Sequence, residues 1–486
     1  MPTRPFSPVP PCRQLAARLL ARYAGWAVAA VVLAPVAMGQ EADDAGVALD
    51  PQVNAAVTAP YLTPVEAAAL RLAHGVPTAE DLRAPATRAS HALDRGAYTD
   101  AALSNPAADP LDRAEAALAR GDFAAAEPLM ADGTSVRALR LRAQSQLLRA
   151  DNTACIRTCR AAVAQLTEGR LKTGDEVAEA VRCAAMLARL TDVSASGGGD
   201  YQAMMAFLAR ARETDPFSWR VRLAEAQLLL DKDNWPEARG AAVEALKRNP
   251  ACAEAYAVLG EIAVSSFDLE AARVIADRLD ALAAMGPLEG DDSLLPSSNG
   301  QPSPQAAFIR VRAALRQNEA DEARDELNYA ARRLPVAPVV LELACAVAAA
   351  SYDERALGAA LAAFKERLGD NPAAEARVGM TFSDLRQYGE AVEHLRRAAA
   401  QAPFWAGPRV DLGLVLVQAA RDDEAAKELD AATRLDPFNV RAANSLKLVR
   451  EVAGYARVET EHFVVRARPG LDALLAREIA LVMEEN

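Results

Sequence analysis

From Leu111 onward, apolar and polar residues follow one another with the spacing of amphipathic helices, and the pattern returns at a fixed interval. Pro403 and Pro437 are 34 residues apart, and five positions before each proline carry matching residue types. A glycine is followed by a bulky apolar residue, an alanine, a leucine and a second alanine. These positions are Gly379, Phe382, Ala391, Leu395 and Ala398 in one unit and Gly413, Leu416, Ala425, Leu429 and Ala432 in the next. A period of this length predicts stacked helical hairpins.

Each repeated position suits one place in a pair of antiparallel helices, which we call helix A and helix B. Gly379 and Gly413 allow helix B to approach helix A closely, and Ala391 and Ala425 provide the small surface that faces them. The bulky apolar residue fills the space between hairpins. The prolines cannot continue a helix, so they end helix B and begin the turn into the next unit. We therefore expect a helical pair between successive prolines.

Weaker copies of the unit end at Pro216, Pro250, Pro335 and Pro372, and another begins at Gly121. Together the copies resemble the tetratricopeptide repeat (TPR). That resemblance implies an all-α, superhelical solenoid of antiparallel helix hairpins whose concave side binds other proteins.

Two stretches interrupt the repeats. Ser194 to Gly199 lengthens the turn inside one hairpin, and Gly286 to Pro304 is a loop rich in Gly, Pro, Ser and Asp that we expect to separate two packed blocks. The expected organisation is a signal peptide at 1–39, a flexible lead-in at 40–110, a first block at 111–285, a linker loop at 286–304, a second block at 305–455 and the start of an incomplete α/β domain at 456–486.

The N-terminus has the order of a secretory signal. Arginines up to Arg22 precede an apolar run from Tyr23 to Met38, and a small-x-small site ends at Gly39. The alternative is an uncleaved membrane anchor, although the run is shorter than the ~20 residues of a spanning helix. Export to the periplasm or the extracellular space is expected, with no membrane span once the signal is removed.

In the lead-in we expect one helix, Thr63 to Ala73, with Thr63 as its cap.

The pattern of apolar and polar residues changes at the C-terminus. Tyr455 to Arg468 alternates in polarity, which predicts a strand near His462 to Val465, and an amphipathic helix is expected from Leu471 to Glu485. The segment TEHFVVRARPG-LDALLAREIALVMEE resembles the opening of a peptidase-like domain of the gluzincin type. That resemblance implies an alternative function, in which the repeats position a substrate for a catalytic domain beyond residue 486.

The formal net charge is −12, which disfavours nucleic acid and anionic lipid as partners. The sequence contains no HExxH, G-x-S-x-G or GxxxxGK[ST] motif, so we expect no enzymatic activity, no metal site and no cofactor. His394 is expected on a solvent-facing helix surface. Cys155 and Cys159 share one helical face and are read as small buried side chains.

The repeats instead predict a binding surface. In stacked hairpins helix A lines the concave side, so its polar residues that need not pack are candidates for contacting a protein or peptide partner. By register these are Gln227, Asp231, Glu261, Ser265, Met380, Ser383, Asp384 and Gln418. Because this set leans acidic, we expect a neutral or basic segment as the guest.

Overall fold

The structure is a computed structural model that describes residues 47–192, 199–287, 294–296 and 303–485. The chain divides into two units at Gly46, and only the second is described. The predicted signal peptide and most of the predicted turn at Ser194 to Gly199 lie outside the described residues.

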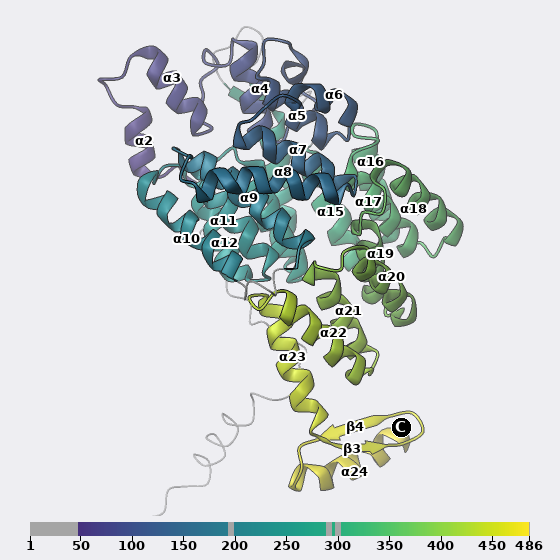
Figure 1. Cartoon of the computed structure of the whole chain (residues 1–486). Helices are drawn as coiled ribbons and strands as arrows, with labels where there is room; N and C mark the ends of the chain where they lie inside the picture. Colours follow the sequence, from purple (N-terminus) through teal and green to yellow (C-terminus); the bar gives the residue numbers. More distant parts are fainter. Residues whose placement is uncertain (1–46, 193–198, 288–293, 297–302, 486) are drawn as a thin grey trace, which may run out of the picture. The chain divides into compact units, whose positions relative to one another are not determined.

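Paired helices follow one another along the chain, as the repeat pattern predicted (Figure 1). The odd-numbered helices are helices A and the even-numbered ones are helices B, with α23 as a final unpaired helix. Their bounds are α5 (Pro110–Ala119), α6 (Phe123–Met130), α7 (Val136–Leu148), α8 (Asn152–Thr167), α9 (Gly174–Leu190), α10 (Gly199–Thr214), α11 (Trp219–Asp231), α12 (Trp235–Leu246), α13 (Ala253–Ser265), α14 (Leu269–Ala284), α15 (Pro304–Arg316), α16 (Ala320–Ala331), α17 (Pro338–Ala350), α18 (Glu354–Leu368), α19 (Ala373–Asp384), α20 (Tyr388–Gln401), α21 (Ala406–Gln418), α22 (Asp422–Leu435) and α23 (Val440–Ala453). The fold is a TPR-like helical solenoid, so the predicted fold class is confirmed.

The close packing expected at the repeated glycines is present. A Cβ atom added to Gly379 would lie 2.6 Å from Cγ of Leu395 on helix B of the same hairpin. At Gly413 the equivalent distance to Cγ of Leu429 is also 2.6 Å. Neither position has room for a side chain, which explains why the period returns to glycine.

The turns between helix A and helix B share a geometry that the sequence does not reveal. In seven hairpins a residue other than glycine has a positive φ angle just after helix A, and Gly121 does the same in the first hairpin. These residues are Ala150, Asp233, Phe267, Asn318, Tyr352, Arg386 and Ala420. A left-handed residue at this place is a common way to end a helix. The same backbone turn thus recurs with different side chains.

The expected flexible lead-in is wrong for the part that the structure describes. Residues 47–109 form α2 (Pro51–Val57), α3 (Pro64–Ala73), α4 (Pro85–Asp94) and the 3₁₀ helix η1 (Ala101–Ser104). The predicted cap of α3 is confirmed, because Thr63 and Glu66 form a reciprocal capping box. We call residues 47–109 the strap.

The strap is ordered because it makes specific contacts with the repeats. The indole Nε1 of Trp219 donates a hydrogen bond to the carbonyl of Ala73 (2.9 Å), and the Arg95 guanidinium donates to the carbonyl of Leu282 (3.0 Å). At Gly75, where φ is +67°, an added Cβ would overlap the side chain of Asn249. These contacts join distant segments, and sequence periodicity does not report on them.

The expected separation into two blocks at Gly286 to Pro304 is also wrong. The described part of this stretch contains a short antiparallel pair, β1 (Met285–Pro287) and β2 (Leu294–Pro296). On either side of it, Leu282 of α14 and Ala306 of α15 belong to one buried cluster. The solenoid therefore continues across the insertion, because α15 stacks on α14 as any helix A stacks on the preceding hairpin.

The C-terminal segment has one more strand than expected. It contains β3 (Ala456–Glu459), β4 (Val464–Ala467) and α24 (Leu471–Glu485), and the two strands pair antiparallel. The predicted strand at His462 to Val465 begins two residues later, because Thr460 and Phe463 hydrogen-bond across a turn that includes His462. On α24 only Ala476 and Ala480 are buried, whereas Leu474 and Leu475 are at least 60% exposed. Whether this segment opens a further domain stays a prediction.

Candidate functional site: a cavity lined by helices A

The odd-numbered helices enclose a cavity of about 970 Å³. Every helix A from α7 to α23 contributes side chains to its wall, and among the described helices B only α12 does, through Trp235. Cavities that bind small ligands in proteins usually measure about 300–1,000 Å³, so this space is large enough for a guest. It is the concave surface that the repeat pattern implied.

Two contacts between distant repeats close the wall of this cavity. The first, which we call the apolar seam, joins α5–α7 to α17–α19. Phe123, Met130 and Leu141 share one buried cluster there with Phe364 and Val378, among others. Asn371 also donates a hydrogen bond from Nδ2 to the carbonyl of Leu148 (2.9 Å) at the end of α7.

The second contact, the polar seam, joins the α11–α12 turn to α21–α23. Lys232 pairs with Asp436 (2.7 Å), and its carbonyl accepts a hydrogen bond from the amide of Val440 (2.9 Å). The carboxylate of Asp233 accepts from Asn439 and from Arg441. Ion pairs and hydrogen bonds thus join distant repeats at the polar seam, whereas apolar side chains join them at the apolar seam.

All eight residues predicted to bind a partner line this one cavity. They are Gln227, Asp231, Glu261, Ser265, Met380, Ser383, Asp384 and Gln418. Several are already paired: Gln227 donates to Glu254, and Ser383 donates to Gln418. Their role in binding stays a prediction, but their placement on a common surface follows from the repeat register.

The expectation that the lining leans acidic is wrong. The wall presents seven arginines, Arg140, Arg182, Arg189, Arg312, Arg316, Arg377 and Arg441, against six carboxylates, Asp231, Asp233, Glu261, Glu342, Asp384 and Asp411. No lysine lines it among the described residues. The predicted set was drawn from residues near the clearest repeats, and it contained three acids and no arginine. One available signal was overlooked: Arg377 lies 34 residues before Asp411, so the two residues occupy the same position of helix A in successive units. The register therefore offered Arg377 as a lining residue.

Aromatic side chains hold two of these arginines in place. The Arg316 guanidinium lies 3.7 Å from the ring centre of Phe267, and that of Arg189 lies 5.1 Å from Trp405. Both rings line the cavity. Stacking on a ring fixes the plane of the guanidinium and leaves its edge for hydrogen bonds.

A second pocket of about 90 Å³ lies at the α7 end and shares Arg140 and Arg182 with the wall of the cavity. Strap residues Leu93, Asp94 and Tyr98 line part of it. Burial raises the pKa of Asp94 to about 6, although Arg220 opposes the shift. The Asp94 carboxylate also accepts a hydrogen bond from Asn249 (3.2 Å). The strap thus places a largely desolvated carboxyl group in this second pocket.

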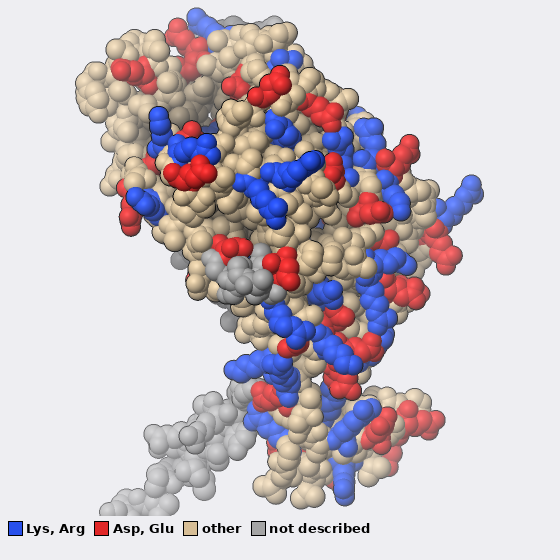
Figure 2. All heavy atoms as spheres, in the orientation of Figure 1, with Lys and Arg blue, Asp and Glu red and all other residues tan. Residues whose placement is uncertain are grey.

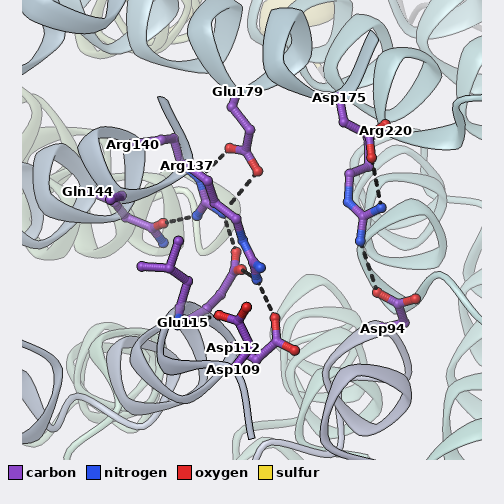
Figure 3. A network of polar contacts seen from close by, with 12 residues as sticks. Asp94, Asp109, Asp112, Glu115, Arg137, Arg140, Gln144, Asp175, Glu179 and Arg220 are labelled. Carbon is purple, nitrogen blue, oxygen red and sulfur yellow. Dashed lines mark hydrogen bonds and ion pairs between the residues drawn. The ribbon is translucent and has the colours of Figure 1, made fainter. Parts of the chain in front are cut away.

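A buried network of charges surrounds this pocket (Figure 3). Arg140 contacts Glu115 (2.5 Å) and Glu179 (2.6 Å), and Arg137 contacts Asp112 (2.6 Å) and Glu115 (2.9 Å). Burial disfavours the charged form of Glu115, but Arg140 and Arg137 hold the pKa of its carboxyl below the usual value. In Figure 3 these side chains converge from neighbouring helices, so the network ties α5, α7 and α9 together.

His394 is not on a solvent-facing surface as expected. It is buried, its Nδ1 lies 2.6 Å from a carboxylate oxygen of Glu375, and its ring contacts Phe382.

Cys155 and Cys159 are fully buried with free thiols, as expected. Their sulfur atoms are 3.8 Å apart.

Within the described part of the chain, one group of three side chains is close enough to hold a metal ion: Glu461, His462 and Glu484. The Glu484 carboxylate already accepts a hydrogen bond from the His462 amide and lies 2.5 Å from His462 Nδ1. This contact fastens α24 to the β3–β4 turn, which accounts for the group without a metal.

None of the described helices has the length and apolar content that crossing a bilayer requires. The space-filling view shows Lys and Arg interspersed with Asp and Glu over the visible face (Figure 2). No one sign of charge forms a continuous stripe there.

Comparison with known proteins gives a likeness of fold only. No protein-family model matches the sequence, and no curated protein matches it. Among solved structures, the chain is similar to the APC/C hetero-tetramer Cut9–Hcn1 (13% identity, 80% of this chain and 70% of that one, TM-score 0.42). It is also similar to yeast Tom70 (13% identity, 76% and 87%, TM-score 0.32) and to YrrB, described as a TPR protein with an unusual peptide-binding site (14% identity, 49% and 97%, TM-score 0.21).

Proposed function

We propose that this chain is an exported scaffold that binds a segment of another protein in the cavity lined by its odd-numbered helices. One observation carries the proposal: helices A from α7 to α23 all turn polar side chains toward a single space of about 970 Å³. Solenoids commonly use such a concave surface for binding extended partners. The chain offers no complete catalytic motif that would favour an enzymatic role.

Site-specific cross-linking tests the binding function. A photoreactive benzoylphenylalanine replaces Met380, which lines the cavity, and in a control protein it replaces Glu366, which is exposed on helix B α18. In the native host, irradiation is expected to couple a protein segment at position 380 and not at position 366. The segment, mapped by mass spectrometry and made as a peptide, should bind the wild type and bind Ser383→Trp less tightly. Equal coupling at both positions would contradict the proposal.

Export is supported by the arginines, apolar run and small-residue site that end at Gly39. We expect cleavage before Gln40. N-terminal sequencing of the protein from the secreted or periplasmic fraction checks this, and a mature protein that retains Trp26 would contradict it.

A further inference from the structure

One part of the cavity wall, formed by α15 and α19, concentrates guanidinium groups. Arg312 and Arg316 lie on α15, and Arg377 lies on α19. All three arginines interact electrostatically with the carboxylate of Asp384 and act to lower its pKa, against the effect of burial. Arg316 donates to Asp384 (2.5 Å), Arg377 donates to Glu342 (2.7 Å), and Arg312 donates to both carboxylate oxygens of Glu261. We call Arg312, Arg316 and Arg377 the arginine wall.

The hydrogen-bonding capacity of the arginine wall exceeds what its partners use. An arginine has five N–H donors, and a carboxylate engages two of them at most in the common paired geometry. Arg316 Nε is buried and has no hydrogen-bond partner among the described residues. Leaving a buried donor unpaired is unfavourable, so an acceptor that reaches this atom would be stabilised.

Electrostatics points the same way. Burial and the nearby Arg377 and Arg316 lower the pKa of Arg312 to about 9, against the opposing effect of Glu342. Burial is the main cause of this lowered pKa, because a desolvated guanidinium is penalised in its charged form even though Arg312 is paired with Glu261. A further carboxylate beside this guanidinium would stabilise the charged form.

An apolar surface adjoins these donors. The Phe267 ring, 59% exposed, stacks beneath Arg316, and Leu315 and Met380 line the same cavity. The wall therefore offers donors for a carboxylate beside a site for an apolar side chain.

We propose that the arginine wall binds an acidic side chain, Asp or Glu, of an extended partner segment, with a large apolar residue of that segment packing on Phe267. This inference rests on the proposed function and reverses the charge that the sequence led us to expect for the guest. It concerns a side-chain carboxylate within the segment and not the carboxylate at its end.

Fluorescence anisotropy of labelled hexapeptides with both ends blocked tests the inference. The acidic probe is Glu-Leu-Glu-Leu-Glu-Leu, compared with the Gln-Leu and Lys-Leu hexapeptides. A further Gln-Leu hexapeptide carries a free C-terminus. The acidic probe is expected to bind at least tenfold more tightly than each of the others, and its affinity should fall with salt.

Substitutions locate the binding site. Arg316→Gln and Arg377→Gln should each weaken binding of the acidic probe at least fivefold. Arg273→Gln, which removes an exposed arginine paired with Glu270 on α14, is the matched control and should leave binding unchanged. Circular dichroism confirms that each variant folds. If Arg316→Gln does not fold, Arg377→Gln carries the test.

The outcomes separate this inference from the proposed function. Tighter binding of the Lys-Leu or free-ended probe, with cross-linking at position 380 retained, overturns the acidic guest and leaves the scaffold function standing. Unchanged affinity in both arginine variants also overturns it, as does the absence of binding by every probe. Loss of specific cross-linking at position 380 contradicts the scaffold function itself.

Discussion

The two seams close the same cavity with opposite chemistry. At the apolar seam, α5–α7 and α17–α19 share a buried cluster of aliphatic and aromatic side chains. At the polar seam, Lys232, Asp233, Asp436 and Arg441 meet in ion pairs at the edge of the cavity. Apolar burial contributes roughly 25 cal/mol per Å². The ion pairs of the polar seam are mostly buried, with the Lys232 and Asp436 side chains 9% and 13% exposed, so the cost of desolvating the charges offsets much of their attraction, and salt weakens what remains. The apolar seam should therefore fix the solenoid, and the polar seam should open without unfolding it.

The largest effect is expected at the apolar seam. Phe364 is 3% exposed and belongs to the shared cluster. Phe364→Ala should lower the free energy of unfolding by about 3–5 kcal/mol, because the substitution leaves a cavity in the core. Denaturant titration measures this loss. Phe364→Leu, which retains most of the volume, should cost less than about 1.5 kcal/mol. A loss below 1 kcal/mol for Phe364→Ala would show that the cluster does not hold the seam.

A change within one hairpin should have a smaller effect than Phe364→Ala and should leave the contact between α5–α7 and α17–α19 in place. Gly413→Leu forces α21 and α22 apart, since even a Cβ would overlap Leu429, and should cost on the order of 1–3 kcal/mol. Hydrogen exchange should accelerate in these two helices first. Gly389→Ala, at a position with open space around it, is the control and should have little effect.

The strap adds a pH-dependent contribution to stability through Asp94. Because the pKa of Asp94 is raised to about 6 in the fold, its contribution to stability is fully present below the unfolded value near 4 and is lost as pH rises through 6. Asp94→Asn keeps an acceptor for Asn249 without the charge. Relative to wild type, the variant should gain on the order of 1 kcal/mol in stability between pH 5 and pH 7. Equal pH dependence of the stability of the two proteins would mean that Asp94 is not desolvated in the fold.

The smallest effect on global stability is expected at the polar seam. Asp233→Asn should change the free energy of unfolding by no more than about 1 kcal/mol, since burial already disfavours the charged form of Asp233 and raises its pKa, and Arg441 keeps its contact with Asp411. Exchange of the Val440 amide, which bonds to the Lys232 carbonyl across the seam, should nevertheless become faster. Raising the salt concentration in the wild type should have the same effect at Val440. Slow, salt-independent exchange there would show that the polar seam is as closed as the apolar one.

The repeated features of the fold could be predicted from the sequence, because a fixed period reflects the packing of helices within each hairpin. Gly379 and Gly413 marked the close approach of paired helices, and the register of helix A placed all eight predicted residues in one cavity. It missed what depends on contacts between distant segments. The strap and both seams join residues that share no period, and the left-handed turn at residues as different as Ala150 and Phe267 leaves no common residue type.

The sign of the cavity charge was missed for a related reason. Arginines such as Arg189 and Arg312 occupy helix A positions that vary from unit to unit. Their side chains line one cavity only once distant repeats pack against each other. Net charge along the chain cannot report a local concentration of this kind.

Hydrogen exchange of the full chain, with and without the peptide mapped by cross-linking at position 380, tests the central claim most directly. If the cavity is the binding surface, the bound peptide should slow exchange in the C-terminal halves of α11, α13 and α15 and along α19 and α21, where the cavity-lining residues lie. The amide of Val440 at the polar seam should also be protected. The outer helices B and α24 should be unaffected. Protection confined to α24 or to the even-numbered helices, with no change in helices A, would contradict the account.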